Sequence, residues 1–268
     1  MAELLKYEFF QNALIASLLS SVICAVIGVI IVQKKLLMMA GGIAHTAYGG
    51  VGLGYLCGFD PLLGAMGFSI LGGVVIAKVN EKKLSNSDVI ISMLWSCGMA
   101  LGIAFIGFAP GYPPDMSTYL FGNILAVTKA DLKLELILTC IVLFLFVMFY
   151  NDWRAFLFDE EGSFIRGIKT RFLSYLLMVM ISLTVVVLIR IAGIILVISL
   201  LAVPASCSVL LSQKFNVRIL LSAVFGALFC VGGLFVSANF SIASGSSIVI
   251  ISCITYGIIY LFRHKKLE

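Results

Sequence analysis

Residues 89–114, VIISMLWSCGMALGIAFIGFAPGYPP, form an unbroken stretch of 26 residues without a charged side chain. An α-helix of about 20 apolar residues crosses the ~30 Å hydrocarbon core of a bilayer. Similar stretches recur along the chain, so that hydrophobic residues make up 62% of the 268 residues and charged residues only 12%. A soluble core does not need so much apolar material. The composition therefore predicts an all-α, polytopic membrane protein with one domain over residues 1–268.

Charged and turn residues divide the chain into about nine membrane helices, and a count of eight or ten also fits the pattern. The 44 uncharged residues 219–262 are too long for one span, and the polar, glycine-bearing stretch 237–247 divides them. The predicted spans are 10–33, 38–57, 61–79, 88–109, 131–150, 171–190, 193–212, 217–237 and 244–262.

The basic residues predict the orientation of these spans. Loops on the cytoplasmic side of a membrane protein carry an excess of Lys and Arg. If Lys34 and Lys35 face the cytoplasm, nine alternating spans place 14 of the 18 Lys and Arg residues on that side. The N-terminus is then outside and the C-terminus inside. The net charge of +5 reflects these loops, so nucleic acid is not expected as a partner.

Two connections are too long to be simple turns. Segment 110–130, on the predicted outer side, has three of the five prolines followed by the short apolar stretch 116–127. It predicts a short interfacial or re-entrant helix. Segment 151–169, NDWRAFLFDEEGSFIRGIK, lies on the predicted inner side and mixes apolar aromatic residues with charges. This composition fits a docking segment for a partner and, equally, an amphipathic helix lying on lipid.

The chain carries no sign of an active site. It lacks a GxxxxGK[ST] phosphate loop, and neither an HExxH motif nor a Ser-His-Asp arrangement is present. We therefore expect a transport protein rather than an enzyme. Energy for transport must come from a partner or from an ion gradient.

His45 is the one histidine expected inside the membrane, in the segment MMAGGIAHTAYGG. An ionisable group at that depth usually faces the bundle interior or a wet pathway, and imidazole is a common ligand of transition metals. The alternative is a core histidine hydrogen-bonded across helices through Thr46 or Tyr48. The nearby glycines, which allow close helix packing, are Gly41, Gly42, Gly49 and Gly50.

Three further residues are weaker candidates. Asp60 and Asp115 lie beside Pro61 and Pro114 at the outer ends of spans, where a role in a turn or as a metal ligand fits the pattern. Pro204 is expected to kink the seventh span, either as a gate hinge or as a simple bend.

Six segments in order together resemble the membrane permease of ABC importers for zinc, manganese or iron, the ZnuB/MntB-like family. They are AGGIAHTAYGGVGLGYLCG, NSDVIISMLWSCGMALGI, PPDMSTYLFGNILAVTKADL, FDEEGSFIRGI, GIILVISLLAVPASCSVLLS and SIASGSSIVII. The resemblance covers most of the chain. It implies a multi-pass protein of a prokaryotic plasma membrane.

The resemblance also implies the partners and the cargo. These are a second copy of the permease, two cytoplasmic ATP-binding subunits and an extracellular metal-binding protein. The cargo is a divalent metal, Zn, Mn or Fe, and no cofactor is bound permanently. FDEEGSFIRGI is expected to form the coupling helix that seats in the ATPase. Its implied contact residues are Phe158, Asp159, Glu160, Glu161, Gly162, Ile165 and Gly167.

One position departs from the family pattern. Family members often carry Asp four residues before the histidine, on the same helix face, whereas this chain has Gly41 there. A pathway without this carboxylate loses a hard oxygen ligand and favours nitrogen-preferring ions. Asp60 or Asp115 could supply the missing charge.

Two alternatives remain at this point. One is a permease for metal chelates or cobalamin-like cofactors, which shares the general architecture. The other is a stand-alone secondary carrier or channel. Gradient-driven carriers generally use acidic residues near the bilayer midplane, and the predicted spans contain essentially none.

Overall fold

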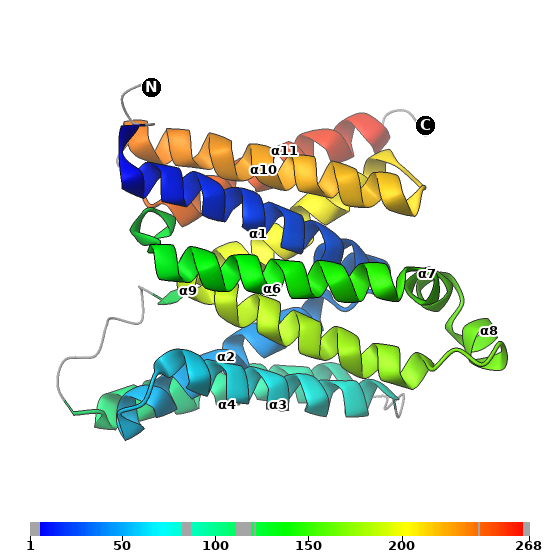
Figure 1. Cartoon of the computed structure of the whole chain (residues 1–268), viewed down its shortest axis with the longest axis horizontal. Helices are drawn as coiled ribbons and strands as arrows, with labels where there is room; N and C mark the ends of the chain where they lie inside the picture. Colours follow the sequence, from blue (N-terminus) through cyan, green and yellow to red (C-terminus); the bar gives the residue numbers. More distant parts are fainter. Residues whose placement is uncertain (1–5, 82–86, 111–118, 121, 241, 265–268) are drawn as a thin grey trace.

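The protein is described here by a computed structural model, which covers residues 6–81, 87–110, 119–120, 122–240 and 242–264. Those residues form helices and connecting turns, with no strand among them. The elements are α1 (Glu8–Gln33), α2 (Leu37–Cys57), α3 (Pro61–Glu81), α4 (Ser87–Phe108), η2 (Ile124–Ala126), α6 (Lys129–Met148), α7 (Tyr150–Phe158), α8 (Glu160–Ile165), α9 (Thr170–Leu211), α10 (Phe215–Phe240) and α11 (Ser244–His264). The long helices run roughly along one axis, and α1 begins at the end opposite to that where α11 finishes (Figure 1).

Helix α9 unites the two spans that were predicted at 171–190 and 193–212. A straight helix of its 42 residues would be about 63 Å long, twice the thickness of the hydrocarbon core. Gly193 interrupts the helix with φ 78° and ψ 160°, a conformation that glycine adopts without the steric cost of a Cβ atom. The two halves of α9 run in opposite directions from this break (Figure 1).

Pro204 is not the position of the break. All of α9 is described, and Gly193 is its only residue with non-helical φ and ψ. Pro204 lies buried in the second half, where the backbone remains helical. The break at Gly193 falls at the boundary between the two predicted spans, where the missing Cβ permits a sharp reversal, and the bend expected at Pro204 stays a prediction.

Six of the described helices are long and apolar enough to cross a membrane, and the pair α6–α7, bent by 72°, could make a seventh. The six are α1, α3, α4, α9, α10 and α11. Helix α2, with its glycines and His45, is not among them. An all-helical membrane protein is thus confirmed, while nine crossings and the side of each terminus stay predictions.

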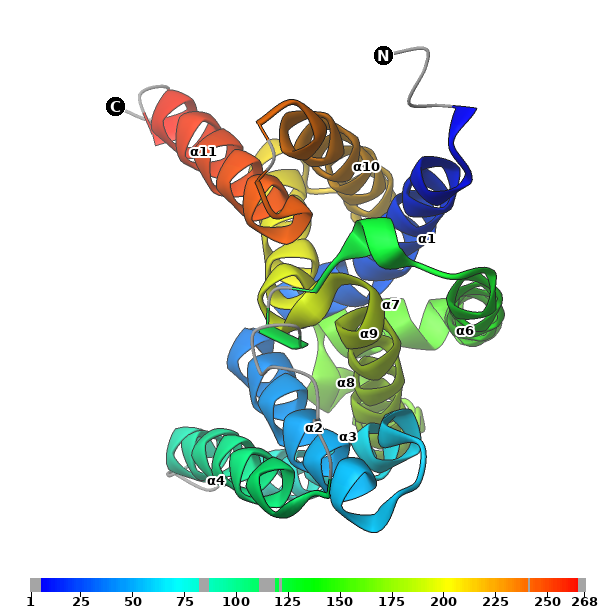
Figure 2. The same cartoon turned by 90° about the vertical axis from the view of Figure 1, so that its left-hand side faces the viewer.

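Helix α2 lies inside the bundle, packed against α3, α4 and α9 (Figure 2). Gly50 explains how α3 approaches so closely, because a Cβ atom placed there would lie 2.0 Å from the carbonyl oxygen of Gly64. The small residues of α2 thus bring it into backbone contact with its neighbour. Among the spanning helices, α1 and α9 are the most buried, and α4 and α11 are among the least.

Candidate functional site

His45 lies half-buried on α2, on the side that faces α4. Its imidazole stacks on the indole of Trp95, with ring centroids 4.1 Å apart and planes inclined by 16°. The Nδ1 atom is buried and has no hydrogen-bond partner in the described part of the chain. Thr46 bonds elsewhere, since its hydroxyl donates to the carbonyl of Gly42 at 2.7 Å. A histidine satisfied through Thr46 is therefore not what the structure contains.

The glycines around His45 face two different helices. A Cβ atom on Gly41 would meet the Trp95 ring at 3.3 Å, and one on Gly42 would meet Ile91 of α4 at 3.0 Å. Gly49 lies against both α3 and α4, and Gly50 lies against α3. Within the described residues, no group of three or more His, Cys, Asp or Glu side chains could hold a metal ion.

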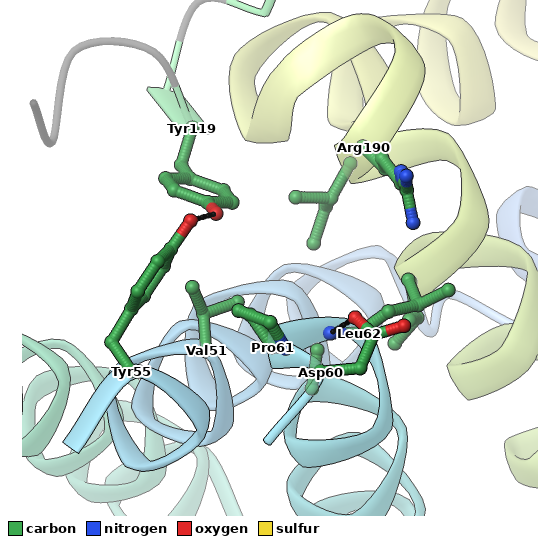
Figure 3. A pocket seen from close by; sticks show the side chains of 10 residues that line it. Val51, Tyr55, Asp60, Pro61, Leu62, Tyr119 and Arg190 are labelled. Carbon is green, nitrogen blue, oxygen red and sulfur yellow. Dashed lines mark hydrogen bonds between the residues drawn. The ribbon is translucent and has the colours of Figure 1, made fainter. Parts of the chain in front are cut away.

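Asp60 lines a separate cavity of about 220 Å³ near the end of α2 (Figure 3). The Asp60 carboxylate accepts a hydrogen bond from the backbone N–H of Leu62 at 2.9 Å, as in a turn. Tyr55 and Tyr119 also line this cavity, and their hydroxyls lie 2.7 Å apart. Burial, with the Tyr55 contact second, raises the pKa of Tyr119 well above its ordinary value. The phenol therefore stays neutral and able to donate.

The structure does not bring Asp60 to His45. Cys57 lies twelve positions after His45 in α2, which is about 18 Å along the helix axis. Asp60 follows Cys57 in the turn, so it belongs to the end of the bundle and not to the surroundings of the imidazole. Asp115, the other acidic candidate, lies outside the described residues.

The segment before α6 is packed into the bundle. Of the stretch 116–127, the structure describes helical residues at 119–120 and the three-residue 3₁₀ helix η2, and residues 116–118 and 121 lie outside the described part. Ile124 and Val127 are buried, so this part of the segment packs into the bundle, and the interfacial or re-entrant helix stays a prediction. Gly122, with φ 59°, sits so close to the break in α9 that a Cβ would lie 2.3 Å from the carbonyl carbon of Ala192.

Arg190 links α9 to the start of α6 at this end of the bundle. Its Nε lies 2.8 Å from an oxygen of Asp131, the residue that forms a capping box with Thr128 at the start of α6. No pattern in the sequence predicted this ion pair. The partner lies 59 positions earlier in the chain.

Glu135 corrects the expectation that the spans are essentially free of acidic residues. Its side chain is completely buried in α6, and one carboxyl oxygen accepts a hydrogen bond from the Ser20 hydroxyl at 2.6 Å. The other oxygen has no partner among the described residues. The sequence signal was an acidic residue one turn after Asp131 in the stretch KADLKLELILTC.

The two short helices α7 and α8 form the α7–α8 segment, at the end of the bundle opposite to the Asp60 cavity (Figure 1). Trp153, Phe156 and Leu157 anchor α7 in the core. Lys34, at the end of α1, places its ammonium 3.6 Å above the Phe156 ring and 2.7 Å from a carboxyl oxygen of Glu160. This side of the segment is therefore fixed to the end of α1.

The other side of the α7–α8 segment is exposed and apolar. Phe158 is 63% exposed, Phe164 71% and Ile165 83%. Asp159 caps α8 by accepting a hydrogen bond from the N–H of Gly162 at 2.8 Å, and the segment turns away at Gly167 with φ 83°. Glu160 and Glu161 occupy the first turn of α8, where negative charge complements the helix dipole.

Residues 6–263 match the ABC 3 transport family. The chain belongs to this family. This membership confirms the resemblance found in the sequence segments, and it makes the chain a multi-pass protein of the cell membrane and a transport subunit rather than an enzyme.

Curated relatives are similar over almost their whole length. The manganese transport system membrane protein MntC of Listeria monocytogenes is 35% identical over 98% of this chain and 94% of its own. The manganese import system permease protein ScaB of Streptococcus gordonii is 31% identical over 97% and 93%. Among solved structures, PsaBC from Streptococcus pneumoniae in complex with Fab matches with a TM-score of 0.85 and 32% identity over 97% of this chain and 95% of that one.

Proposed function

We propose that this chain is the membrane subunit of an ATP-driven importer for manganese, with zinc or iron as further cargoes. The observation that carries the proposal is the 35% identity to a manganese transport permease over 98% of the chain. The stacked, half-buried imidazole of His45 offers a nitrogen ligand along a route through the membrane.

Two copies of the chain enclose this route. A single chain contributes one imidazole and no described cluster of His, Cys, Asp or Glu. A second copy brings a second His45, and the partly open side of that residue is the side a partner can reach. Two imidazoles and several waters bind a divalent ion weakly, which suits a conduit because the ion must also leave.

The membrane topology has nine crossings with the N-terminus outside. Helix α9 then counts twice, and its reversal at Gly193 lies on the outer side together with the Asp60 cavity. The α7–α8 segment, at the opposite end of the bundle (Figure 1), is then cytoplasmic. The placement of 14 of the 18 Lys and Arg residues on that side supports this direction.

The α7–α8 segment is the docking element for a cytoplasmic ATP-binding subunit. Its exposed Phe158, Phe164 and Ile165 supply the apolar contact, and the acidic first turn of α8 supplies charge. An extracellular metal-binding protein delivers the ion at the Asp60 end. Binding of ATP between the partner subunits moves the α7–α8 segments, and the helices expose His45 to each side in turn.

The test is uptake of Mn²⁺ by proteoliposomes that hold the chain, its ATP-binding partner and the loaded binding protein. We expect uptake only with ATP and with all three components, and a loss of at least tenfold for His45→Ala. Uptake falls as the pH is lowered, because a protonated imidazole cannot ligate a metal. Transport by the chain alone, or faster transport of a metal chelate than of the free ion, would contradict the proposal.

A further inference from the structure

The space beside His45 is filled by an indole ring. Trp95 reaches across from α4, stacks on the imidazole of His45 at 4.1 Å and lies 3.3 Å from the position of a Cβ atom on Gly41. Two residues of α2, one helical turn apart, therefore lie against the same aromatic side chain of α4. We propose that Trp95 positions the imidazole for metal binding and determines, together with Gly41, which ligands surround the ion.

The imidazole needs such a partner. A metal-binding histidine almost always donates its second ring N–H to a carboxylate, a carbonyl or a water, and this bond fixes the orientation of the ring. The Nδ1 atom of His45 is buried without any partner among the described residues. The stacked indole is the contact that holds the ring plane, with the planes only 16° from parallel.

The packing of α2 on α4 makes the stack rigid. Gly98 lies three residues after Trp95, and a Cβ atom placed on it would come 2.5 Å from the Cα atom of Thr46. The two backbones therefore touch one residue beyond His45, which sets the spacing at which the two rings meet.

Gly41 completes the arrangement because it leaves room for the indole. Any side chain at position 41 would compete with Trp95 for the same space. The His45 site therefore offers nitrogen and an aromatic face, and no carboxylate from the preceding turn. Such surroundings suit imidazole-preferring ions such as Zn²⁺ better than a carboxylate-rich site would, and bind Mn²⁺ weakly.

This inference rests on the proposed function, and its first test uses the same complete importer in proteoliposomes. Trp95→Leu should raise the KM for Mn²⁺ about tenfold, as loss of a group that orients a metal-binding histidine does, while kcat stays within about twofold. Trp95→Phe, which keeps a stacked ring, should recover most of the affinity. Phe108→Leu on the same helix, where the side chain is 78% exposed, is the matched control and should leave KM unchanged.

The outcomes separate the two proposals. If the unaltered importer takes up no Mn²⁺, or if His45→Ala transports normally, the proposed function fails. If His45→Ala is inactive and Trp95→Leu keeps the original KM, only the role of Trp95 is wrong. Equal KM values for Trp95→Phe and Trp95→Leu would also overturn it, because stacking would then have no part.

A second measurement leaves Trp95 in place and does not depend on the folding of its variants. The chain has two tryptophans, Trp95 and Trp153. Trp153→Phe leaves Trp95 as the only fluorescent indole and breaks no described hydrogen bond, because Trp153 Nε1 has no partner. Paramagnetic Mn²⁺ should quench this fluorescence, and His45→Ala in the same background should abolish the quenching. Quenching that is absent, or that survives without His45, would contradict the stacked site.

Discussion

Lys34 and Glu160 form an ion pair between the end of α1 and the first turn of α8, with Nζ 2.7 Å from the carboxyl oxygen. The side chain of Lys34 is only 14% exposed, and its ammonium also lies over the Phe156 ring. Three residues after Lys34 the chain enters α2, which carries His45. This corner therefore joins the α7–α8 segment to the helix that we propose lines the metal route.

Lys34→Met should uncouple the importer. We expect ATP hydrolysis to continue while the amount of Mn²⁺ transported per ATP falls severalfold. Without the ion pair, a movement of the α7–α8 segment is no longer transmitted to the start of α2. The stability should change by less than about 1 kcal/mol, since Glu160 is half exposed. The ratio of Mn²⁺ uptake to phosphate release measures the effect. Lys35→Gln is the control, because Lys35 is exposed and loses the same charge one residue away; an equal loss of coupling there would refute the role of Lys34.

Charge reversal in the first turn of α8 should have a stronger effect. Replacing Asp159, Glu160 and Glu161 together by Lys removes the cap of α8 and places positive charge at its N-terminus, where the helix dipole disfavours it. Binding of the ATP-binding subunit should weaken, and ATP hydrolysis should no longer drive uptake. Co-purification of the two subunits and the same coupling ratio provide the measurement. If ATP hydrolysis still drives uptake fully in this variant, the segment does not dock the ATP-binding subunit and instead lies on the lipid surface.

Gly50→Ala should destabilise the bundle. The added methyl group would lie 2.0 Å from the carbonyl oxygen of Gly64, so that α2 and α3 must move apart at a cost of about 1–3 kcal/mol. The thermal unfolding temperature of the detergent-solubilised protein should fall. Gly67→Ala on α3 is the matched control, because a Cβ atom there meets nothing within 4 Å and alanine favours the helix. Equal unfolding temperatures for the two variants would show that α3 can shift freely.

Arg190→Gln should loosen the packing around the break in α9. The variant leaves one oxygen of Asp131 without its ion pair, at a cost of about 1–3 kcal/mol; the low end applies because Arg190 is about half exposed. Amide hydrogen exchange in residues 122–131 should become faster. Lys133→Gln removes a charge from an exposed position on α6, the helix of Asp131, and should leave the exchange unchanged. No difference between the two variants would mean that the ion pair does not hold the segment.

The effect of Gly41→Asp should change direction when the indole is removed. With Trp95 present, the new side chain meets the ring, and Mn²⁺ uptake should fall. In the double variant Gly41→Asp/Trp95→Ala the carboxylate has room beside His45, and uptake of Mn²⁺ relative to Zn²⁺ should rise above that of Trp95→Ala alone, because Mn²⁺ prefers oxygen ligands. Competition between the two metals in the transport assay measures this. An unchanged preference would mean that position 41 does not face the ion.

Some features of the candidate site could be predicted and others could not. His45 was identified because an ionisable group in an apolar run is rare enough to be noticed. Its stacking partner Trp95 was not, since an aromatic residue in a membrane helix has no distinctive pattern. Glu135 was visible as a charge but was overlooked near the end of a span, where charged residues are common.

The sequence by itself determined the helices and their order, because the hydropathy of a segment and the turn residues that end it are local properties of the chain. It also indicated the family, through segments spread over its length. Only the tertiary structure decided that Lys34 meets Glu160, that Arg190 meets Asp131 and that Trp95 covers His45. Each of these pairs joins residues at least 50 positions apart, and their contact depends on how whole helices pack, which no local pattern encodes.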